Sequence, residues 1–438
     1  MRSLLEKALD EVKKANAQGD LIFNSSKSLK LSAFGKELTE YKVSGSQVLG
    51  LRLIKDNRVG IAYTESLDDD SLIHLVRAAL TNASASSVNQ YEEIAYNEGE
   101  LHDEEISAQP QVDVEEKVAK VTGLLESFKM SDSRVESLPY NGYAENVNMN
   151  MYLNSHGRFV TRQDQFFQSW AMPMLVENGK KATYYDSIIA SSYQHLSWDR
   201  LREETIQTSA ALLNTIHLKT AKYQVEFIPD CLGEFFGRFS SLFSAKSVIN
   251  KMNPWQKMLG QKVIHDSLTL TDDTHFKDAF SHYQCDGEGF LHKKINLIEN
   301  GVLKTFLHNS ATAKELGHEN TFHAIRGAGS PLGISRTNFI LNANGTQNFS
   351  DTYVEIIQLD GLSSGSNDVT GDFSCGAKGF LHQNGEKIAF ADATLSGNFF
   401  EMLKNLSVVD KSLSANNGRS LFVPRIIFHD LSIAGQGV

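Results

Sequence analysis

The residues with the most recognisable catalytic spacing are His318, Glu319 and His323, which spell an HExxxH pattern. A catalytic zinc ion needs three protein ligands and a carboxylate that acts as general base for the bound water. Gly317 is a typical helix end, and two histidines five positions apart diverge by about 140° around a regular helix. We therefore predict a solvated loop here. A stand-alone zinc peptidase that uses these three residues is kept as an alternative.

A second group, His282, Cys285 and Asp286, has the residue types of a nucleophile and its base. A lone cysteine becomes reactive only when its surroundings lower its pKa, and the sequence shows no such partner. A small buried residue near a turn is the favoured interpretation of Cys285. The neighbouring glycines Gly287 and Gly289 do not form a phosphate loop, because the GxxxxGK[ST] pattern is missing.

The third group lies in residues 367–379, which read NDVTGDFSCGAKG. Three glycines among Asp, Thr and Ser are typical of an irregular backbone that holds polar groups toward a cleft, and a buried strand is not expected. We predict that Asp368, Thr370, Asp372 and Ser374 line a cleft for peptides.

The elements that position these groups follow from apolar spacing and turn signals. An Asn-Gly hairpin signal at 384–385 and a run from 399 to 406, capped by Asn398 with Glu401, come directly after the polar stretch. A capping box at Ser3 and Glu6 opens the first helix. Helical spacing predicts helices over 3–18, 68–82, 113–128, 197–213, 229–243 and 310–316. Alternation predicts strands in 29–33, 48–63, 147–175, 183–190, 223–228, 295–307 and 387–395, and Asn-Gly pairs at 141, 178, 300, 344, 384 and 417 favour antiparallel hairpins.

These patterns predict an α+β fold. A small N-terminal helix and sheet unit covers residues 1–85, and a polar, acidic linker covers 86–112. A central domain of helices and antiparallel strands follows over 113–217, and a β-rich C-terminal domain over 218–438. The later domains are mainly antiparallel β-sheet with flanking helices.

Composition excludes several classes of protein. The net charge of -11 and the lack of a Lys and Arg cluster argue against a nucleic-acid binder. Three distant cysteines, at 231, 285 and 375, form no CxxC pair, so a disulfide framework and a cysteine zinc cage are not indicated. No secretion signal or membrane-spanning stretch of about 18 apolar residues is found. We expect a cytoplasmic protein that does not enter the membrane.

Several of these stretches resemble the TldD/PmbA family. Residues 369–374 (VTGDFS), 384–386 (NGE) and 394–398 (TLSGN) are similar to its C-terminal signature, and to the TldE (PmbA) branch more than to TldD. Residues 297–304 (LIENGVLK), 310–317 and 335–338 (SRTN) are similar as well. The matches cover about 220–438 closely and the rest by general layout. The family also carries the older label of modulator of DNA gyrase.

The resemblance implies a role in proteolysis or peptide maturation. The family's catalytic branch carries HExxxH on the helix after the strand that matches 223–228, and a cysteine ligand near the C-terminus. Aligned without gaps, that motif falls on 237–242 (GRFSSL), and no histidine lies between His217 and His265. Residues 416–419 (NNGR) stand where the cysteine ligand is expected. We therefore expect no catalytic or metal residues and no zinc in this chain.

The resemblance further implies an accessory subunit in a dimer. Its expected partner is a TldD-like zinc peptidase, with the zinc in that subunit and an unfolded peptide as substrate. A homodimeric peptide-binding protein without a catalytic partner is the other alternative. The sequence does not identify the peptide or the partner, or distinguish a homodimer from a heterodimer.

Overall fold

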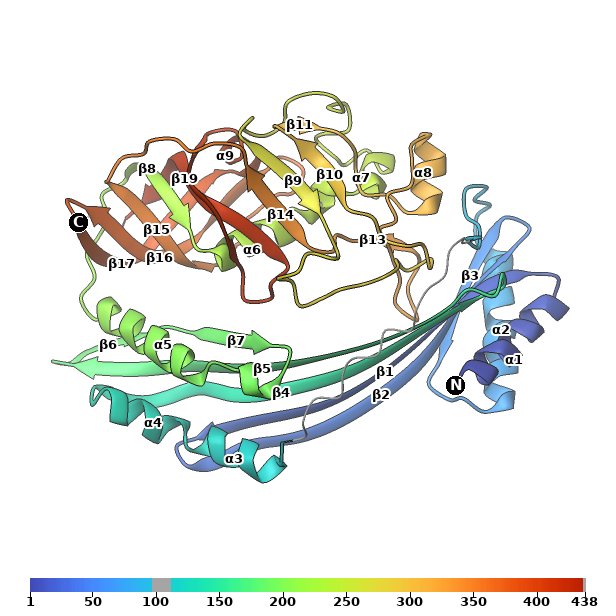
Figure 1. Cartoon of the computed structure of the whole chain (residues 1–438), viewed down its shortest axis with the longest axis horizontal. Helices are drawn as coiled ribbons and strands as arrows, with labels where there is room; N and C mark the ends of the chain where they lie inside the picture. The colour runs from blue at the N-terminus through green and yellow to red at the C-terminus, as the bar shows by residue number, and fades with distance from the viewer. Residues whose placement is uncertain (97–111, 436–438) are drawn as a thin grey trace.

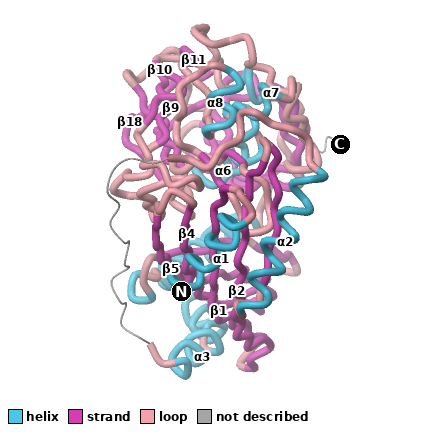
Figure 2. Tube along the Cα trace, turned by 90° about the vertical axis from the view of Figure 1, so that its right-hand side faces the viewer, coloured by secondary structure: helices cyan, strands magenta, loops and turns pink. Residues whose placement is uncertain are grey.

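The computed structural model describes residues 1–96 and 112–435, and it shows a mixed α+β fold with two large sheets (Figures 1 and 2). This confirms the predicted fold class. Within the described residues, no helix is both long enough and apolar enough to cross a membrane. The predicted linker falls partly outside the described residues, since 97–111 are not among them.

The first sheet is long and curved (Figure 1). Its strands follow the order β3-β2-β1-β4-β5-β6, and β7 also pairs with β5. All these pairings are antiparallel, and β1 pairs along most of its length with both β2 and β4. The sheet thus joins strands from both sides of the predicted linker. Its members are β1 (Gln18–Phe34), β2 (Glu37–Lys55), β3 (Arg58–Thr64), β4 (Val135–Asn154), β5 (Phe159–Glu177), β6 (Lys180–Thr183) and β7 (Asp186–Ala190).

The second sheet fills the C-terminal half and partly closes on itself. Its order is β11-β10-β9-β14-β19-β17-β16-β15-β8, and β8 also pairs with β19, so five strands complete a ring. β18 pairs with β19, and β12 (Ala324–Ile325) pairs separately with β13 (Gly333–Ile334). The strands are β8 (Ala221–Phe227), β9 (Leu268–Asp272), β10 (Ile295–Glu299), β11 (Val302–Leu303), β14 (Phe339–Ala343), β15 (Tyr353–Asp360), β16 (Asp372–Gln383), β17 (Glu386–Asn398), β18 (Leu406–Ala415) and β19 (Leu421–Ala434).

The helices lie mainly at the ends of the curved sheet and inside the C-terminal half. Figures 1 and 2 show α1 (Arg2–Lys14) and α2 (Asp69–Ala85) against the β1–β3 end, where they share an apolar core with these strands. α3 (Val114–Thr122), α4 (Leu124–Ser131) and α5 (Trp198–Leu212) cover the other end, near the 3₁₀ turn η1 (Tyr193–His195). The largest core surrounds α6 (Pro229–Arg238), and the shorter helices are η2 (Ser240–Phe243), α7 (Ala245–Ile249), α8 (Ser310–Leu316) and α9 (Phe399–Met402).

Several local predictions need correction. The predicted capping box of the first helix is wrong, because α1 already begins at Arg2 and Glu6 pairs with Arg2 instead. The helix predicted over 113–128 is interrupted at Gly123, and the helix predicted from 399 ends at Met402. Asn398 does cap α9, since its side chain accepts hydrogen bonds from the backbone N–H groups of residues 400 and 401.

Only the first part of the polar stretch 367–379 has an irregular backbone. From Asp372 onward it belongs to β16, in which Phe373, Cys375 and Ala377 are buried and the residues between them point outward. The alternation of small and apolar residues has the period of a strand that is buried on one face. The expectation that this stretch is not a buried strand is therefore wrong for its second half.

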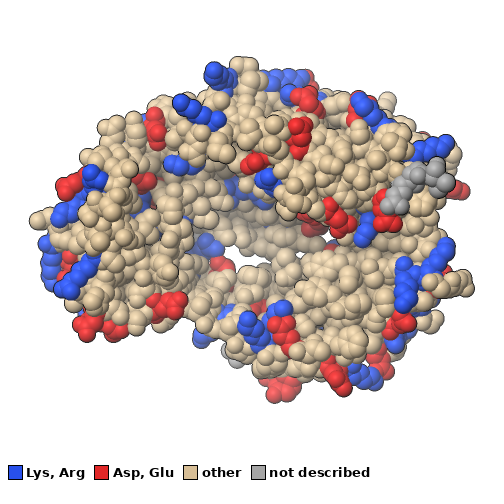
Figure 3. Space-filling view, turned by 180° about the vertical axis from the view of Figure 1, so that it is seen from behind, with Lys and Arg blue, Asp and Glu red and all other residues tan. Residues whose placement is uncertain are grey.

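A hollow separates the two halves of the molecule, as the space-filling view from behind shows (Figure 3). Asn24, Ser26, Ser46, Asn148 and Asn150, which we call the polar midsection, come from the middle of β1, β2 and β4 and line a cavity there. Strand pairing sets these residues side by side, because Asn24 is opposite Asn150, and Ser26 is opposite both Asn148 and Ser46. The curved sheet thus turns a hydrogen-bonding surface toward the C-terminal half.

Candidate functional site

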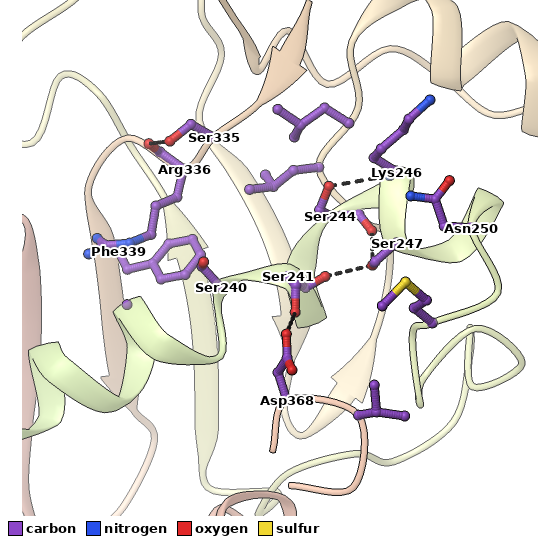
Figure 4. A pocket seen from close by; sticks show the side chains of 15 residues that line it. Ser240, Ser241, Ser244, Lys246, Ser247, Asn250, Ser335, Arg336, Phe339 and Asp368 are labelled. Atoms are coloured by element: carbon purple, nitrogen blue, oxygen red, sulfur yellow. Dashed lines mark hydrogen bonds between the residues drawn. The ribbon is translucent and has the colours of Figure 1, made fainter. Parts of the chain in front are cut away.

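Four neighbouring cavities lie in this region: three lie between the curved sheet and the C-terminal half, and the fourth, the serine pocket, lies within the C-terminal half. The serine pocket has a volume of about 530 Å³ and is lined by Ser240, Ser241, Ser244, Ser247, Asp368 and Arg336, among others (Figure 4). The arginine pocket, of about 290 Å³, contains Arg162, Arg326 and Arg336 in its wall. A midsection cavity of about 500 Å³ includes the polar midsection, and an asparagine cavity of about 430 Å³ includes Asn416 and Asn417.

The four cavities are adjacent because they share residues. Ser335 and Arg336 line both the serine pocket and the arginine pocket. The arginine pocket and the midsection cavity have Arg162 and Tyr283 in common, and Phe280 lines both the midsection and asparagine cavities. We call this row of adjoining cavities the cleft, and its arrangement suits an extended ligand better than a compact one.

Aromatic packing positions the serine pocket. Phe235, Phe236 and Phe239 are fully buried, and the ring of Phe239 stacks on that of Phe399 at 4.6 Å. This confirms the prediction that the aromatic residues of 229–243 pack in the core. The helix expected over the whole stretch ends with α6 at Arg238, and residues 240–243 form η2. The serines between and after the buried rings face the cavity.

The hydroxyls of Ser244 and Ser247 form hydrogen bonds with the local backbone. Ser247 Oγ donates to the carbonyl oxygens of Ser241 and Ser244 at 2.6 Å, and Ser244 Oγ accepts from the backbone N–H of Lys246 at 3.2 Å (Figure 4). Among the described residues, no imidazole or ammonium group is hydrogen-bonded to these hydroxyls. The carboxylate nearest to a serine hydroxyl, Asp368, is 3.5 Å from Ser241 Oγ and is also paired with Arg238, so the arrangement is suited to binding a polar ligand.

Of the four predicted cleft residues, the structure brings Asp368 to a cavity. Its carboxylate lies 3.7 Å from the guanidinium of Arg238, and Ser241 Oγ donates to it at 3.5 Å (Figure 4). Thr370, Asp372 and Ser374 are exposed beside the pocket, at the start of β16. A role in peptide binding remains a prediction for all four.

Neighbouring polar groups form hydrogen bonds with the three exposed residues, Thr370, Asp372 and Ser374. Asn398 Nδ2 donates to the carbonyl oxygen of Thr370 at 2.8 Å and to Asp372 Oδ1 at 2.9 Å. These contacts lower the pKa of Asp372, with the bond from Asn398 as the main cause. Ser396 Oγ donates to Ser374 Oγ at 3.0 Å. Asp372 therefore carries a negative charge on this surface at neutral pH.

The histidine motif does not assemble as a unit. His318 and Glu319 are exposed, but His323 is buried, and its Nε2 lies 3.1 Å from Asp272 Oδ1. The prediction of a solvated loop is thus wrong for His323, because the chain after residue 320 turns back into the protein. The His318 ring instead lies 5.6 Å from that of His308.

The cysteine group also stays apart. Asp286 is buried and accepts hydrogen bonds from the backbone N–H groups of Glu288, Phe290 and Ala324 at 3.0–3.1 Å. Burial raises its pKa to about 8, and the nearby Glu288 carboxylate adds to this effect. His282 is exposed, and Cys285 is half-buried in the wall of the arginine pocket. Asp286 therefore organises the turn beside Cys285, which is half-buried and not fully buried as the sequence led us to expect.

Most residues of the cleft could not be predicted from the sequence. Arg162, Arg326 and Arg336 come from β5, the segment after β12, and the segment before β14, so no spacing in the sequence links them. Four serines within residues 240–247 were a visible signal, since they interrupt an apolar stretch at positions that cannot all be buried.

Two family models match this chain. The family model of the PmbA/TldA metallopeptidase C-terminal domain matches residues 220–435, and the model of domain 1 matches residues 19–83. The chain belongs to the PmbA/TldD family. The matched C-terminal region contributes the serine pocket and one wall of each of the other three cavities.

Relatives in this family cover nearly the whole chain. The metalloprotease PmbA homolog of Haemophilus influenzae is 24% identical over 423 residues, which are 93% of this chain and 91% of the relative. A Thermotoga maritima structure named as a proposed modulator of a DNA gyrase is 24% identical with a TM-score of 0.86, covering 99% and 100% of the two chains. TldE from Thermococcus kodakarensis is 20% identical with a TM-score of 0.85 and the same coverage. The two structures share the fold of this chain.

The metallopeptidase family name raises the question of a metal site. Residues 237, 240 and 241, in the segment where the resemblance leads us to expect the family's zinc motif, line the serine pocket together with one carboxylate, Asp368, and the cations Lys246 and Arg336. Zinc binds through His, Cys, Asp or Glu, so a single carboxylate beside two cations does not fit the ion. Over residues 1–96 and 112–435, no three His, Cys, Asp or Glu side chains are grouped to hold a metal.

Proposed function

We propose that this chain is a TldE-like accessory subunit of a two-subunit metallopeptidase. In this proposal it binds extended peptides in its cleft, while a TldD-like partner supplies the zinc and the hydrolytic chemistry. The observation that carries the proposal is an elongated polar cleft whose serine pocket has no donor set for zinc. The match to the PmbA/TldD family and the shared fold with a protein named TldE support it.

The cleft has the chemistry that an extended peptide requires. A peptide in extended form presents unpaired backbone N–H and C=O groups along its length, and these need hydrogen-bond partners. The amides of Asn24, Asn148 and Asn150 and the hydroxyls of Ser26 and Ser46 both donate and accept hydrogen bonds. This surface therefore recognises the backbone without selecting strongly among side chains, and it fits a substrate that is unfolded.

Asp368, Thr370, Asp372 and Ser374 form the proposed peptide contact at the serine-pocket end. Asp368 lines the pocket, Thr370 follows it in the loop before β16, and Asp372 and Ser374 continue the polar surface outward along β16. Replacing Asp368 by Asn keeps the shape and removes the charge. We expect D368N to weaken the binding of a labelled basic peptide more than that of an acidic one, as measured by fluorescence anisotropy.

Metal analysis and co-purification test the proposal together. The chain is purified alone without chelator, supplied with zinc, and its zinc content is determined by elemental analysis. It is also used as bait in an extract of its native cell. We expect no stoichiometric zinc in the chain itself, a co-purifying homologue that carries HExxxH, and peptidase activity only in the complex.

The alternatives predict different results in the same experiments. Stoichiometric zinc and peptidase activity that are lost on His318→Ala would make this chain a stand-alone peptidase. His318 is the suitable target because it is exposed, whereas replacing the buried His323 would also disturb the fold. A stable homodimer in light scattering, with peptide binding but no co-purifying homologue, would indicate a peptide-binding protein without a catalytic partner.

A further inference from the structure

Arg326 is a buried cation with unused hydrogen-bond donors. Its side chain is 0% exposed, and its Nη2 contacts the carboxylate of Asp20. Its Nε and Nη1 have no hydrogen-bond partner within the described residues. A buried donor that is left unpaired costs about 1–3 kcal/mol. This arrangement calls for an acceptor, and Arg326 lies in the wall of the arginine pocket.

Other cations surround the same pocket. The guanidinium of Arg162 stacks on the ring of Tyr283 at 3.5 Å and contacts Asp164 at 2.6 Å. Arg336 Nη1 donates to the carbonyl oxygen of Ser420 at 2.7 Å, which leaves its other N–H groups for a further partner.

The remaining titratable groups in the wall do not balance this charge. Asp286 is already engaged by three backbone N–H groups. Burial lowers the pKa of His292 to about 3, so its imidazole is neutral at pH 7. Arg162 is paired with Asp164, and Arg326 is paired with Asp20 through Nη2. The donors of this pocket without an acceptor among the described residues are therefore the Nε and Nη1 of Arg326 and the N–H groups of Arg336 other than the one on Nη1 that serves Ser420, and these favour an anion.

One side of the arginine pocket is apolar. Ile22, Tyr152 and Val160 form a small buried cluster on the inner face of the curved sheet, against which Cys285 packs. Ile325 adds an exposed aliphatic side chain on the opposite wall. With a volume of about 290 Å³, the pocket is at the small end of ligand sites, which suits one terminal residue and not a long segment.

We propose that the arginine pocket binds the C-terminal carboxylate of an extended peptide and holds an apolar last side chain against Ile22, Tyr152 and Val160. The rest of the peptide then runs along the polar midsection, because the midsection cavity shares Arg162 and Tyr283 with this pocket. This inference rests on the proposed peptide-binding function, which it deepens by selecting peptides with a free, apolar C-terminus.

The experiment uses two fluorescein-labelled peptides of identical sequence that end in leucine, one with a free carboxylate and one with a C-terminal amide. Anisotropy titrations with the full chain compare their affinities. Charge-assisted hydrogen bonds to guanidinium are strong, so we expect the amide to bind at least about tenfold more weakly. Because the change is made in the peptide, the fold of the protein is not disturbed.

A protein variant completes the comparison. Arg336→Gln should reduce the affinity for the free-acid peptide to about that for the amide and leave the amide unchanged. Arg134→Gln is the matched control, since Arg134 also pairs with carboxylates but lies outside the cavities, and it should change neither affinity.

Three results would overturn the inference. These are equal affinities for acid and amide, no binding of either peptide, and competition by free N-acetylleucine as strong as that of the unlabelled peptide. The last would assign the pocket to small carboxylates. No binding of either peptide would contradict the proposed peptide-binding function as well, whereas equal affinities would contradict this inference alone. Zinc content and co-purification test the accessory-subunit role separately.

Discussion

Replacing Asp20 by Asn tests whether a buried cluster of charged side chains between the curved sheet and the C-terminal half stabilises the fold. Asp20 on β1 accepts hydrogen bonds from Arg52 Nε at 2.9 Å and Nη2 at 2.6 Å, and it also contacts Arg326 from the segment after β12. All three side chains are at most 1% exposed. The cluster thus links two neighbouring strands of the first sheet to a segment more than 300 residues later in the chain.

The expected loss in the free energy of unfolding depends on which carboxylate partners Arg52 and Arg326 retain in D20N. Arg52 retains the Glu92 carboxylate at 2.9 Å and Glu288 at 4.0 Å, whereas Asp20 is the one carboxylate paired with Arg326 among the described residues. Removing one partner of a buried pair costs about 3–5 kcal/mol, and the remaining contacts of Arg52 place D20N at about 3 kcal/mol. For a urea m-value of about 3 kcal/mol/M, the midpoint falls by about 1 M.

Urea unfolding followed by circular dichroism measures this change. D69N is the control, because Asp69 pairs with Lys7 at 2.9 Å but both side chains are more than half exposed, and its midpoint should stay that of the wild type. The double variant D20N/R326M should recover part of the loss, since the uncompensated charge is then gone. A midpoint unchanged by D20N, or an equal fall with D69N, would refute the argument.

Three further predictions concern packing, pH and capping. A Cβ on Gly379 would lie 1.8 Å from the carbonyl oxygen of Glu355, so G379A should yield little soluble protein, whereas G345A, with open space around it, should express normally. Burial lowers the pKa of His292 to about 3, so the unfolded chain takes up a proton below about pH 6.5 and the folded chain does not. Stability should therefore fall between pH 6.5 and 3, by up to about 1.4 kcal/mol per pH unit from this group, and urea midpoints of H292N should fall less steeply. N398A removes the cap of α9 and should lower thermal stability by about 1 kcal/mol in calorimetry.

Local signals in the sequence predicted the elements well because their causes are local. The Asn-Gly pairs at 178, 300 and 384 form turns with positive φ at both residues, as type I′ hairpins require. Gly317 ends α8 in the left-handed conformation, and Asp68 caps α2 by accepting from the backbone N–H of Ser71. Each of these interactions spans at most a few residues, so one stretch of sequence contains both partners.

Predictions were wrong where contacts with a distant segment of the chain determine the local structure. The pair Asn141 and Gly142 lies inside β4 and not in a turn. Glycine is required at position 142 for packing, because a side chain there would collide with the carbonyl oxygen of Leu31 and with the Trp170 ring. Asn141 Nδ2 donates to the carbonyl oxygen of Ala33 at 2.9 Å. Gly142 therefore allows close packing against the neighbouring strands, and the residues next to it in the sequence give no sign of that packing.

The candidate site shows the same limit. The polar stretch after residue 367 indicated a functional surface, and Asp368 does line a cavity, but Arg238 and Ser241 beside it come from about 130 residues earlier. The arginine pocket had no signal of its own, since its cations lie on segments that only the fold brings together. Residue types predicted polar binding in general, and the three-dimensional arrangement was needed to show where cations gather.

The cleft can change its chemistry without losing its shape because different residues perform the two tasks. The core behind the serine pocket is made by Phe235, Phe239 and Phe399, which are fully buried, whereas the serines that face the cavity contribute little to that core. A fold held by such a core accepts substitutions on its cavity side at small cost in stability. Under the proposed function, the fold keeps a cleft for peptides while the cavity wall carries serines where the catalytic branch is expected to carry zinc ligands. This is the physical basis for proposing an accessory subunit.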